Sequence, residues 1–374
     1  MIPYGKQNVD EEDIAAVISA LRSDWLTTGP LVDEFERRVC EFTGAKEGAA
    51  LCNGTAALHA SMHALGVGKG DEVIVTPMTF AASANCILYV GARPVFCDIE
   101  PDTLLIDVES IKKKISKKTK AIVGVDYAGH PCDWDAINDL AEDHDLRTVA
   151  DSCHSLGGKY KGRSVGTLAD LSVLSFHPVK HITTGEGGMV LGQDPILIKS
   201  IRSFRNHGID RDHRQRSEKA TWKYDMVDLG YNYRLTDIQC ALGISQLRKL
   251  PKWLERRQEI AARYNRLLKG ADHVVPLSVR PWARHAYHLY VVKVTGGKGR
   301  DLLFNAMRKA GIGVNVHYIP VHLHPYYEKH QGTKAGQCPN AEQAYSQILS
   351  LPMYPGLKDD EIDLVADVLL GNSI

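Results

Sequence analysis

Short apolar runs alternate with amphipathic stretches along residues 45–240 of the chain. Segments with the length of buried strands, most of them apolar, lie at residues 49–52, 72–76, 94–99, 121–127, 147–151, 171–176 and 188–191. Stretches with the 3.6-residue period of helices separate them, at residues 55–65, 80–90, 108–115 and 133–142. Strands that alternate with helices need crossover connections, so this pattern predicts an α/β fold with a largely parallel central sheet.

Further helices and strands are predicted on both sides of this region. Amphipathic helices precede it at 11–21 and 31–42, and a long helical stretch follows at 236–270, with an expected break at Pro251. A strand at 288–294, a helix at 299–310, a strand at 313–318 and a helix from Asp359 predict a smaller α+β unit.

These elements predict two domains and one long loop. We expect a large domain over residues 1–245, which includes the N-terminal helices, and a small C-terminal domain over residues 246–374, which includes the linking helix. Residues 205–228 are polar and charged, and we predict a long loop there, a feature that is usually functional or covers a partner.

The composition excludes several classes of protein. The 374 residues carry 45 Lys+Arg and 45 Asp+Glu, so the chain lacks the basic charge typical of nucleic-acid binding. No apolar run approaches the ~18 residues of a membrane-spanning helix, and the acidic N-terminus, broken by Pro3 and Gly5, does not resemble a secretory signal. The 8 Cys form no C-x-x-C pair, which favours reduced thiols in the cytoplasm over a zinc site or disulfides. We therefore expect a cytoplasmic protein with no nucleic-acid or membrane partner and no metal.

Common cofactor and catalytic motifs are also absent from the sequence. It has neither the G-x-x-x-x-G-K-[ST] phosphate loop nor a G-x-G-x-x-G between a strand and a helix, which disfavours P-loop and nicotinamide enzymes. It has no H-E-x-x-H and no G-x-S-x-G.

The most informative segment is SFHPVKHITTGEGGM at residues 175–189. A single lysine is usually a solvated surface charge, but Lys180 lies between an apolar strand and a glycine-rich turn, with His177 and His181 beside it. Such a site can lower the pKa of a lysine, and the neutral amine is a nucleophile toward carbonyl groups. Lys180 is therefore a candidate catalytic residue.

Asp151 ends the predicted strand RTVAD, at the edge where parallel sheets bind ligands. Taken alone, it could equally cap the next helix. Paired with an activated lysine, a carboxylate opposite a pyridine nitrogen would keep that nitrogen protonated, which is what makes pyridoxal phosphate (PLP) an electron sink.

Two further features fit a ring with a phosphate. Residues 52–56 (CNGTA) join a strand to a helix, where free N–H groups and the helix dipole bind anions, although an ordinary capped turn has the same pattern. Phe80 follows the strand EVIVT and could stack on a ring, although core packing is the commoner role of such a residue.

At this point the chain resembles the DegT/DnrJ/StrS family of PLP-dependent sugar aminotransferases, which have the aspartate aminotransferase fold (PLP transferase fold type I). The resemblance covers nearly the whole chain, through WLTTGP (25–30), NGTAAL (53–58), TPMTFAASANCILYVGARPVFCDI (76–99), VDYAG (125–129), ADSCHS (150–155), SFHPVKHITTGEGGM (175–189), GYNYRLTDIQCALG (230–243) and VHYIPVH (316–322). Within the family it is most similar to the PseC type, which aminates C4 of a UDP-linked 4-keto-6-deoxy-N-acetylhexosamine in pseudaminic acid biosynthesis.

The resemblance implies roles for individual residues. Lys180 matches the lysine that bonds to the cofactor, Asp151 the partner of its pyridine nitrogen, and His154 a position beside the ring near its phenolic oxygen. The positions that match cofactor contacts are Gly54, Thr55, Ala56, Phe80, Asp151, His154, Ser175, Lys180 and Asn232.

Other matched positions concern the second subunit and the substrate. Asn232 matches a residue that reaches the phosphate from the other subunit, which implies a homodimer with shared active sites. The positions that match a substrate-binding region are Thr28, Arg234, His317 and Tyr318.

The function that the resemblance implies is transfer of an amino group, with glutamate as donor, to C4 of the UDP-linked keto sugar. The charged loop, with Arg211, Arg214 and Arg216, could bind the diphosphate, but a solvated loop explains these charges as well. Another nucleotide-linked 4-keto or 3-keto sugar is an alternative substrate.

Two other functions compete with an aminotransferase. One is a PLP-dependent sugar dehydratase, whose family members have the lysine replaced, usually by His. Lys180 is present here, although His181 follows it directly. The other is a PLP-binding or sugar-binding regulatory module without turnover, which the intact set of Lys180, Asp151 and His154 disfavours.

Overall fold

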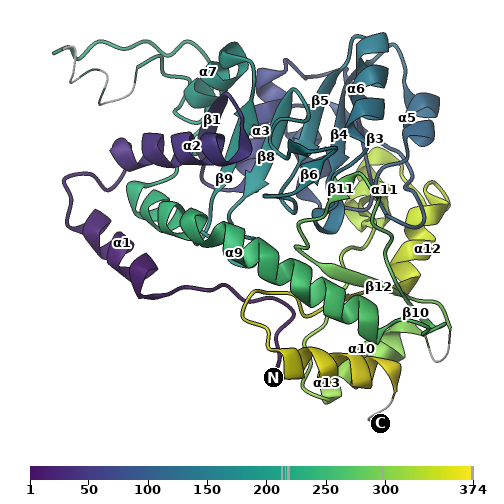
Figure 1. The fold of residues 1–374 in the computed structure, drawn as a ribbon. Coiled ribbons are helices and arrows are strands. Elements are labelled where there is room, and N and C mark those ends of the chain that lie inside the picture. The colour runs from purple at the N-terminus through teal and green to yellow at the C-terminus, as the bar shows by residue number, and fades with distance from the viewer. Residues whose placement is uncertain (212–213, 215, 217–219, 297–298, 372–374) are drawn as a thin grey trace.

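The computed structural model describes all residues except 212–213, 215, 217–219, 297–298 and 372–374 (Figure 1). A seven-stranded sheet forms the centre of the larger part, in the order β1-β9-β8-β5-β4-β2-β3. Its strands are β1 (Glu47–Leu51), β2 (Glu72–Val75), β3 (Arg93–Phe96), β4 (Thr119–Val125), β5 (Arg147–Asp151), β8 (Leu171–Ser175) and β9 (Gly188–Gly192). Only β9 runs against its neighbours, so the prediction of a largely parallel sheet is confirmed.

Both faces of this sheet are buried, because neighbouring residues of a strand point to opposite faces. Val173 and Val190 pack in one apolar cluster with α3 (Gly54–Ala64) and α7 (Pro195–Phe204). Leu174 follows Val173 and Met189 precedes Val190, so both point to the opposite face. They pack in a second apolar cluster with α2 (Pro30–Thr43) and α9 (Asp237–Leu267). Continuous apolar runs therefore suit these strands better than an alternating pattern.

The helices of the crossover connections follow the predicted pattern closely. They are α4 (Ala82–Tyr89), α5 (Val108–Lys114) and α6 (Trp134–Asp143), and α1 (Glu11–Leu21) precedes the sheet. The short strands β6 (Lys159–Tyr160), β7 (Arg163–Ser164) and β11 (Ala283–Arg284) form a separate three-stranded sheet that the sequence analysis did not predict.

The C-terminal part has its own sheet and apolar cluster. The strands β10 (Val274–Pro276), β12 (Tyr290–Val294) and β13 (Ile348–Leu351) form the sheet, and the helices are α10 (Arg300–Lys309), α11 (Pro325–Gln331), α12 (Pro339–Gln347) and α13 (Asp359–Leu370). The N-terminus reaches this part as well, since Ile2 forms a bridge with Ile312 and packs in the same cluster. The division into domains at residue 245 stays a prediction, and it falls inside α9.

Two predicted details of this part are wrong. The helix α9 runs from Asp237 to Leu267 through Pro251, although proline cannot donate the backbone hydrogen bond of that position. Residues 313–318 form no strand, and their backbone has one isolated bridge, between Asn315 and Ser350. Tertiary packing overrides local preference at both places.

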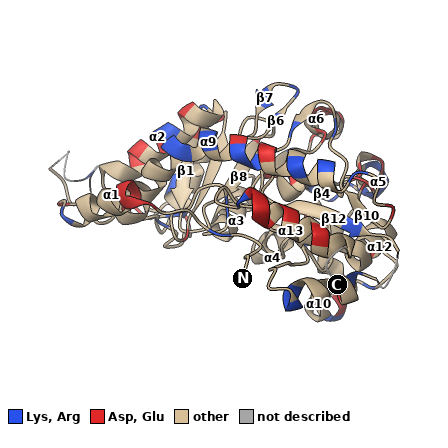
Figure 2. Ribbon diagram, turned by 60° about the horizontal axis from the view of Figure 1, so that its bottom comes forward, with Lys and Arg blue, Asp and Glu red and all other residues tan. Residues whose placement is uncertain are grey.

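Charged side chains of both signs are interspersed over the helices (Figure 2). The acidic helix α13 lies beside basic residues of α9, where Arg256 and Arg263 both pair with Asp359 (2.6 and 3.0 Å). Within the described residues, no helix combines the length and the apolar character that crossing a membrane would require.

Candidate active site

The residues with candidate chemistry meet at the carboxyl ends of β4, β5 and β8. Asp151, the last residue of β5, is almost fully buried. Its Oδ2 accepts a hydrogen bond from Ser83 Oγ of α4 (2.6 Å), and its Oδ1 accepts one from the backbone N–H of Cys153 (3.3 Å). A carboxylate can accept further hydrogen bonds, so Asp151 is held in orientation and can still accept a proton donor from a ligand. Capping of a helix, the alternative from the sequence, is not what these contacts show.

Lys180 lies in the turn that follows β8 and is half-buried. Its backbone N–H donates to His177 O (2.9 Å), and the N–H of Thr184 returns to Phe176 O (3.0 Å). Burial lowers the pKa of the Lys180 ammonium group, while the nearby Cys153 and Asp151 act in the opposite direction. A lowered pKa increases the fraction of neutral amine, which is the nucleophilic form.

His154 and Tyr318 connect the two parts of the chain at this site. The Nε2 of His154 lies 3.1 Å from the hydroxyl of Tyr318. Tyr318 belongs to the C-terminal part of the chain, three residues after Asn315, which bridges to β13. The Nδ1 of His154 is buried and has no hydrogen-bond partner among the described residues. Burial, reinforced by the charge of Lys180, lowers the pKa of His154 well below the usual value, so its ring is neutral. An unpaired buried nitrogen is expected where a ligand supplies the missing partner.

The start of α3 has the features of an anion site. The side chain of Asn53 caps the helix by accepting from the N–H of Ala56 (2.8 Å), which leaves Gly54 and Thr55 at the positions whose N–H groups have no intrahelical acceptor. A Cβ on Gly54 would lie 3.2 Å from the Cβ of Ser175, at the end of β8. The absence of a side chain at Gly54 therefore keeps the space between α3 and Ser175 open.

Phe80 is 61% exposed, so it is not a core residue as its position in the sequence would ordinarily suggest. Its ring centroid lies 6.1 Å from that of Tyr318, at an angle of 57°. An exposed aromatic face beside Tyr318 is suited to stacking on a planar ligand.

The residues present therefore fit a planar ring that carries a phosphate. Asp151 and His154 Nδ1 offer polar partners to the ring, Phe80 a stacking face, α3 and Ser175 an anion site, and Lys180 an amine. These are the groups that pyridoxal phosphate requires.

Two buried residues at this site were not singled out from the sequence. The ring of His288 lies 4.4 Å from that of His154, between centroids, and its Nδ1 is also buried without a described partner. Ser83 holds Asp151. The only signal for His288 is a histidine at the start of an apolar strand, and neither residue is near its partner in sequence, so both depend on the tertiary structure.

The residues that match substrate positions are divided between two regions. His317 lies beside Tyr318, with its Nδ1 2.8 Å from Ser350 Oγ, and burial together with Lys180 lowers its pKa to about 4. Thr28 and Arg234 instead line a cavity of about 1280 Å³, and Lys180 is not among the described residues that line it.

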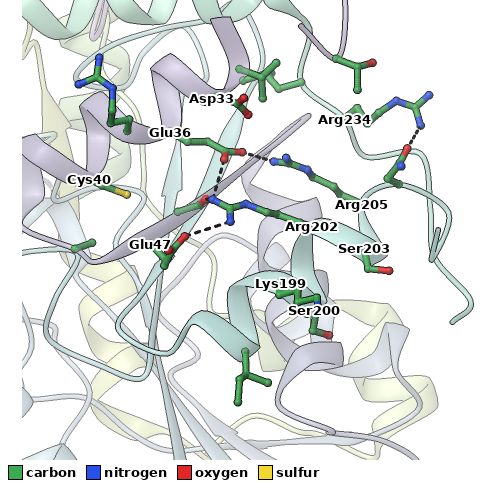
Figure 3. Close-up of a pocket in the computed structure, with 18 of the residues that line it drawn as sticks. Asp33, Glu36, Cys40, Glu47, Lys199, Ser200, Arg202, Ser203, Arg205 and Arg234 are labelled. Carbon is green, nitrogen blue, oxygen red and sulfur yellow. Dashed lines mark hydrogen bonds and ion pairs between the residues drawn. The ribbon is translucent and has the colours of Figure 1, made fainter. Parts of the chain in front are cut away.

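Several arginines of this cavity already have partners within the chain. Figure 3 shows Arg202 and Arg205 turned toward Glu36, and Arg202 also pairs with Glu47 (3.2 Å). Arg234 donates to the side chain of Asn206 (2.7 Å). Among the described residues that line the cavity, Lys46 and Lys199 have no ion-pair partner, so they are the cations that a ligand would meet unpaired.

The predicted loop, residues 205–228, lies between α7 and α9, and its residues 212–213, 215 and 217–219 are outside the described part of the structure. Arg214 and Arg216 have helical backbone, so the described part of this segment is not loop throughout. Of its arginines, Arg211 pairs with Asp210 (3.5 Å), Arg214 with Asp33, and Arg216 stacks on the ring of Tyr224 (4.6 Å to the centroid). The loop is less polar than expected, because its second half exposes apolar side chains. These are Trp222, Tyr224, Met226, Val227, Leu229 and Tyr231.

Asn232 follows this apolar run directly and is exposed. Its backbone forms a bridge with Asn206, and the next residue, Tyr233, accepts a hydrogen bond through its carbonyl from the N–H of Cys52 (2.8 Å). The side chain of Asn232 is thus at the surface and can reach a neighbouring molecule.

Comparison with known proteins shows which family the chain resembles over its length. The sequence model of the DegT/DnrJ/EryC1/StrS aminotransferase family matches residues 7–370. A Campylobacter jejuni protein named UDP-4-amino-4,6-dideoxy-N-acetyl-beta-L-altrosamine transaminase is 39% identical over 374 residues, which cover 99% of this chain and 96% of the relative.

Solved structures are similar over the same length. Spr1654 from Streptococcus pneumoniae, named as a sugar aminotransferase and solved in its PLP form, has a TM-score of 0.93 and 34% identity, over 99% of this chain and 98% of that one. PseC from Helicobacter pylori, named as an aminotransferase of pseudaminic acid biosynthesis, has a TM-score of 0.92 and 34% identity, over the same shares of the two chains.

Proposed function

The chain belongs to the DegT/DnrJ/EryC1/StrS aminotransferase family, and from this premise we propose that it transfers an amino group, from glutamate, to C4 of a UDP-linked 4-keto-6-deoxy-N-acetylhexosamine. As a member of this family it is a PLP-dependent sugar aminotransferase. The observation that carries the proposal is the meeting of Lys180, Asp151 and the unpaired Nδ1 of His154 in one buried cluster. The choice of sugar is supported by the name of the C. jejuni relative.

The residues assigned to the cofactor divide its binding between them. Pyridoxal phosphate, when bound, supplies an electron sink for the bonds at the donor's alpha carbon. We assign its pyridine nitrogen to Asp151, its ring face to Phe80, and its phenolic oxygen to His154. We assign the phosphate of the cofactor to Gly54, Thr55 and Ala56 at the start of α3, together with Ser175. The N–H of Ala56 is already bonded to the side chain of Asn53.

Lys180 is assigned the proton transfers of the reaction. Its amine is both the attachment point of the cofactor and, once released, the general base that takes the proton from the donor's alpha carbon. Because burial lowers its pKa, a larger fraction of the amine is free to accept this proton near pH 7. The same group, when protonated, returns a proton as general acid when the sugar is aminated.

The keto sugar has to present C4 to this amine. Tyr318 and His317 lie on the C-terminal side of the cluster, and we assign them to the sugar. We assign Thr28 and Arg234 to the sugar nucleotide bound at the partner subunit, since the cavity that they line does not include Lys180 among its described lining residues. Binding of the nucleotide supplies the energy that holds the C4 carbonyl of the sugar in position beside the amine.

We also infer that the enzyme is a homodimer with shared active sites. The side chains of Trp222 and Leu229 are 80% and 74% exposed, in a run of apolar residues that leads directly to Asn232. An apolar run of this kind is typical of a protein interface. Contact of this run with a second copy would carry Asn232 toward the partner's phosphate site.

A first experiment tests the role of Lys180. Borohydride reduction of the enzyme with pyridoxal phosphate should fix the cofactor to Lys180, as located by peptide mass mapping. Lys180→Ala should lose the trapped cofactor and the transamination, because the amine that bonds to the cofactor and transfers the protons is removed. Trapping on another lysine, or retained turnover in Lys180→Ala, would contradict the assignment.

A second experiment tests the substrate. UDP- and dTDP-linked 4-keto and 3-keto sugars are each incubated with the enzyme and glutamate, and the sugar product is analysed by mass. The proposal predicts that the UDP-linked 4-keto-6-deoxy-N-acetylhexosamine gains the amine with the highest kcat/KM. A higher kcat/KM for another sugar would identify that sugar as the substrate and leave the aminotransferase class unchanged.

A further inference from the structure

Asp126 is a buried carboxylate at the end of β4 that the assignments above do not use. It is 0% exposed, and its backbone N–H donates to the carbonyl of Asp151 on the neighbouring strand (3.1 Å). Its side chain accepts four hydrogen bonds from described residues, two at each oxygen. A carboxylate without such partners would be very costly to bury, so this set of contacts is what makes Asp126 compatible with the core.

The Oδ2 of Asp126 holds the turn that carries His154. It accepts from the hydroxyl of Ser152 (2.8 Å) and from that of Ser155 (2.7 Å), the residues on either side of Cys153 and His154. The N–H of Ser155 also returns to the carbonyl of Ser152 (3.0 Å), which closes the turn. Both ends of the turn are therefore tied to one carboxylate.

The Oδ1 of Asp126 holds a second segment, residues 127–133. It accepts from the N–H of Cys132 (2.9 Å) and from the indole Nε1 of Trp134 (3.0 Å). The carbonyl groups of Ala128 and Gly129 in this segment accept from the N–H groups of Leu289 (3.1 Å) and Ala286 (2.8 Å). This segment thus supports the stretch that carries His288.

The two segments meet at Gly129, where there is no room for a side chain. Gly129 has a φ of +109°, and a Cβ on it would lie 2.9 Å from the carbonyl oxygen of His154 and 3.0 Å from the backbone nitrogen of His288. The rings of His154 and His288 lie 4.4 Å apart. The carboxylate of Asp126 therefore holds both backbone segments that position the two histidines beside the candidate cofactor site.

We propose that Asp126 is a positioning residue for the transamination, which holds His154, and through residues 127–133 His288, in place beside Lys180. The proposal rests on the assignment of His154 under the proposed function. Asp126 acts through the two serines and does not touch the cofactor. A neutral amide in its place would keep the shape of the core and weaken the attachment of the turn. One of the two accepting oxygens would become an NH2 group, which cannot accept a hydrogen bond, and the remaining amide oxygen accepts less strongly than a carboxylate.

The test compares Asp126→Asn with the wild type by two readouts. The first readout is the NMR spectrum of the histidine ring nitrogens, recorded on 15N-histidine-labelled protein without cofactor. The signals of His154 are identified as those that are missing from the spectrum of the His154→Gln variant. The wild type should show one fixed tautomer of His154, and Asp126→Asn should show exchange between tautomers. The second is turnover of the loaded enzyme, where kcat should fall on the order of 100-fold, as for a ~1 Å misplacement of a reacting group, while the KM for the sugar changes little.

Matched variants separate positioning from a loss of stability. Asp13 is another fully buried carboxylate, on α1, which accepts from Gln246 (2.6 Å) and pairs with Lys249 (2.9 Å). Asp13→Asn should lower the unfolding midpoint and leave the His154 signal and kcat unchanged. An Asp126→Asn protein that behaves like Asp13→Asn would overturn the proposal.

If Asp126→Asn does not fold, Ser155→Ala replaces it in the test. This variant removes one of the two hydroxyl donors to Oδ2 and should shift the His154 signal in the same way, with a smaller loss of kcat. Its control is Ser245→Ala, because Ser245 is equally buried and its hydroxyl has no described partner. An unchanged His154 signal in Ser155→Ala would overturn the proposal.

The two proposals fail in different ways. If the proposed function is wrong, the wild type itself transfers no amine to any sugar of the panel, whereas the histidine spectrum needs no substrate and still reports whether Asp126 fixes His154. If the kcat of His154→Gln equals that of the wild type, the assignment of His154 to the cofactor is wrong. The proposed effect of Asp126 on kcat is then wrong as well.

Discussion

At the scale of single residues, the candidate site surrounds one lysine with neutral histidines. Burial lowers the pKa values of His154, His181 and His288 well below the usual range, and the positive charge of Lys180 adds to the effect for all three. Neutral rings can accept hydrogen bonds and do not add cationic charge beside the amine. The site therefore favours the neutral form of Lys180 by burial without surrounding it with further cations.

His317 provides a prediction about stability and pH. Its pKa is about 4 in the folded protein against an ordinary value of 6.5, so between these values the unfolded chain binds more protons than the folded one. The free energy of unfolding should therefore fall as the pH is lowered from 6.5 to about 4, with a contribution from His317 on the order of 3 kcal/mol. Denaturant unfolding at a series of pH values measures this.

The variant His317→Asn isolates this contribution. It cannot titrate, so its free energy of unfolding should depend less steeply on pH than that of the wild type over the same window. The other buried histidines remain in both proteins and cancel in the comparison. Parallel curves for the two proteins would show that His317 is not held neutral.

At the scale of elements, the contact between β9 and the start of α3 decides the candidate phosphate site. A Cβ on Gly188, the first residue of β9, would lie 2.7 Å from the backbone nitrogen of Gly54 and closer still to the carbonyl oxygen of Asn53. The strand can approach the helix only because residue 188 has no side chain. The position of the free N–H groups of α3 thus depends on a glycine outside the helix.

We predict that Gly188→Ala weakens the binding of pyridoxal phosphate. The methyl group should push the start of α3 away from Ser175 and cost one charged hydrogen bond, which raises Kd about tenfold to a hundredfold. Fluorescence titration of the cofactor-free enzyme measures this. Gly68→Ala is the control, because a Cβ there meets nothing within 4 Å; equal affinities in the two variants would contradict the prediction.

The long helix α9 shows where local preference was a poor guide. Pro251 predicts a break, yet the helix continues to Leu267, since Leu247 and Leu250 pack into one apolar cluster and Ile260 and Tyr264 into another. Burial of these side chains outweighs the one hydrogen bond that proline cannot make. The result is a single rigid element that contacts both parts of the chain.

At the scale of the whole molecule, the proposed dimer can be tested by complementation. Lys180→Ala and Asn232→Ala should each be inactive alone, because each lacks one half of every site. Co-expressed with different tags, they should form mixed dimers with one intact site, and random pairing should restore about a quarter of the wild-type activity.

The pair Lys180→Ala and Asp151→Ala is the control for this experiment. Both residues belong to the same side of the site, so their mixed dimers contain no intact site and should stay inactive. Equal activity in the two mixtures would show that Asn232 does not act across the interface.

Much of the fold followed from the sequence because its signals are local. The strands predicted at 147–151 and 171–176 became β5 and β8 with nearly the same bounds. In the second, the apolar run LSVLSF is the local signal of a strand that is buried on both faces. The strand expected at 313–318 did not form. Residues 313–318 meet the free edge of β13 at a single bridge, between Asn315 and Ser350, and the pairing does not extend to the neighbouring residues.

The candidate site divides in the same way. Lys180, Asp151 and the start of α3 could be identified from sequence, because each depends on a strand end or turn within a few residues of itself. The partners of these residues could not. Ser83 reaches Asp151 across 68 residues of sequence, and Tyr318 reaches His154 across 164.

The sequence by itself determined the strands of the central sheet, the order of the helices between them and the chemical groups at the strand ends, because periodicity and turn chemistry act over a few residues. Only the tertiary structure decided which buried groups meet. It brought His288 against His154 and gave Asp126 its four donors, and it showed an exposed apolar run in a segment that composition describes as charged. Contacts of this kind depend on how distant elements pack, and no short stretch of sequence contains that information.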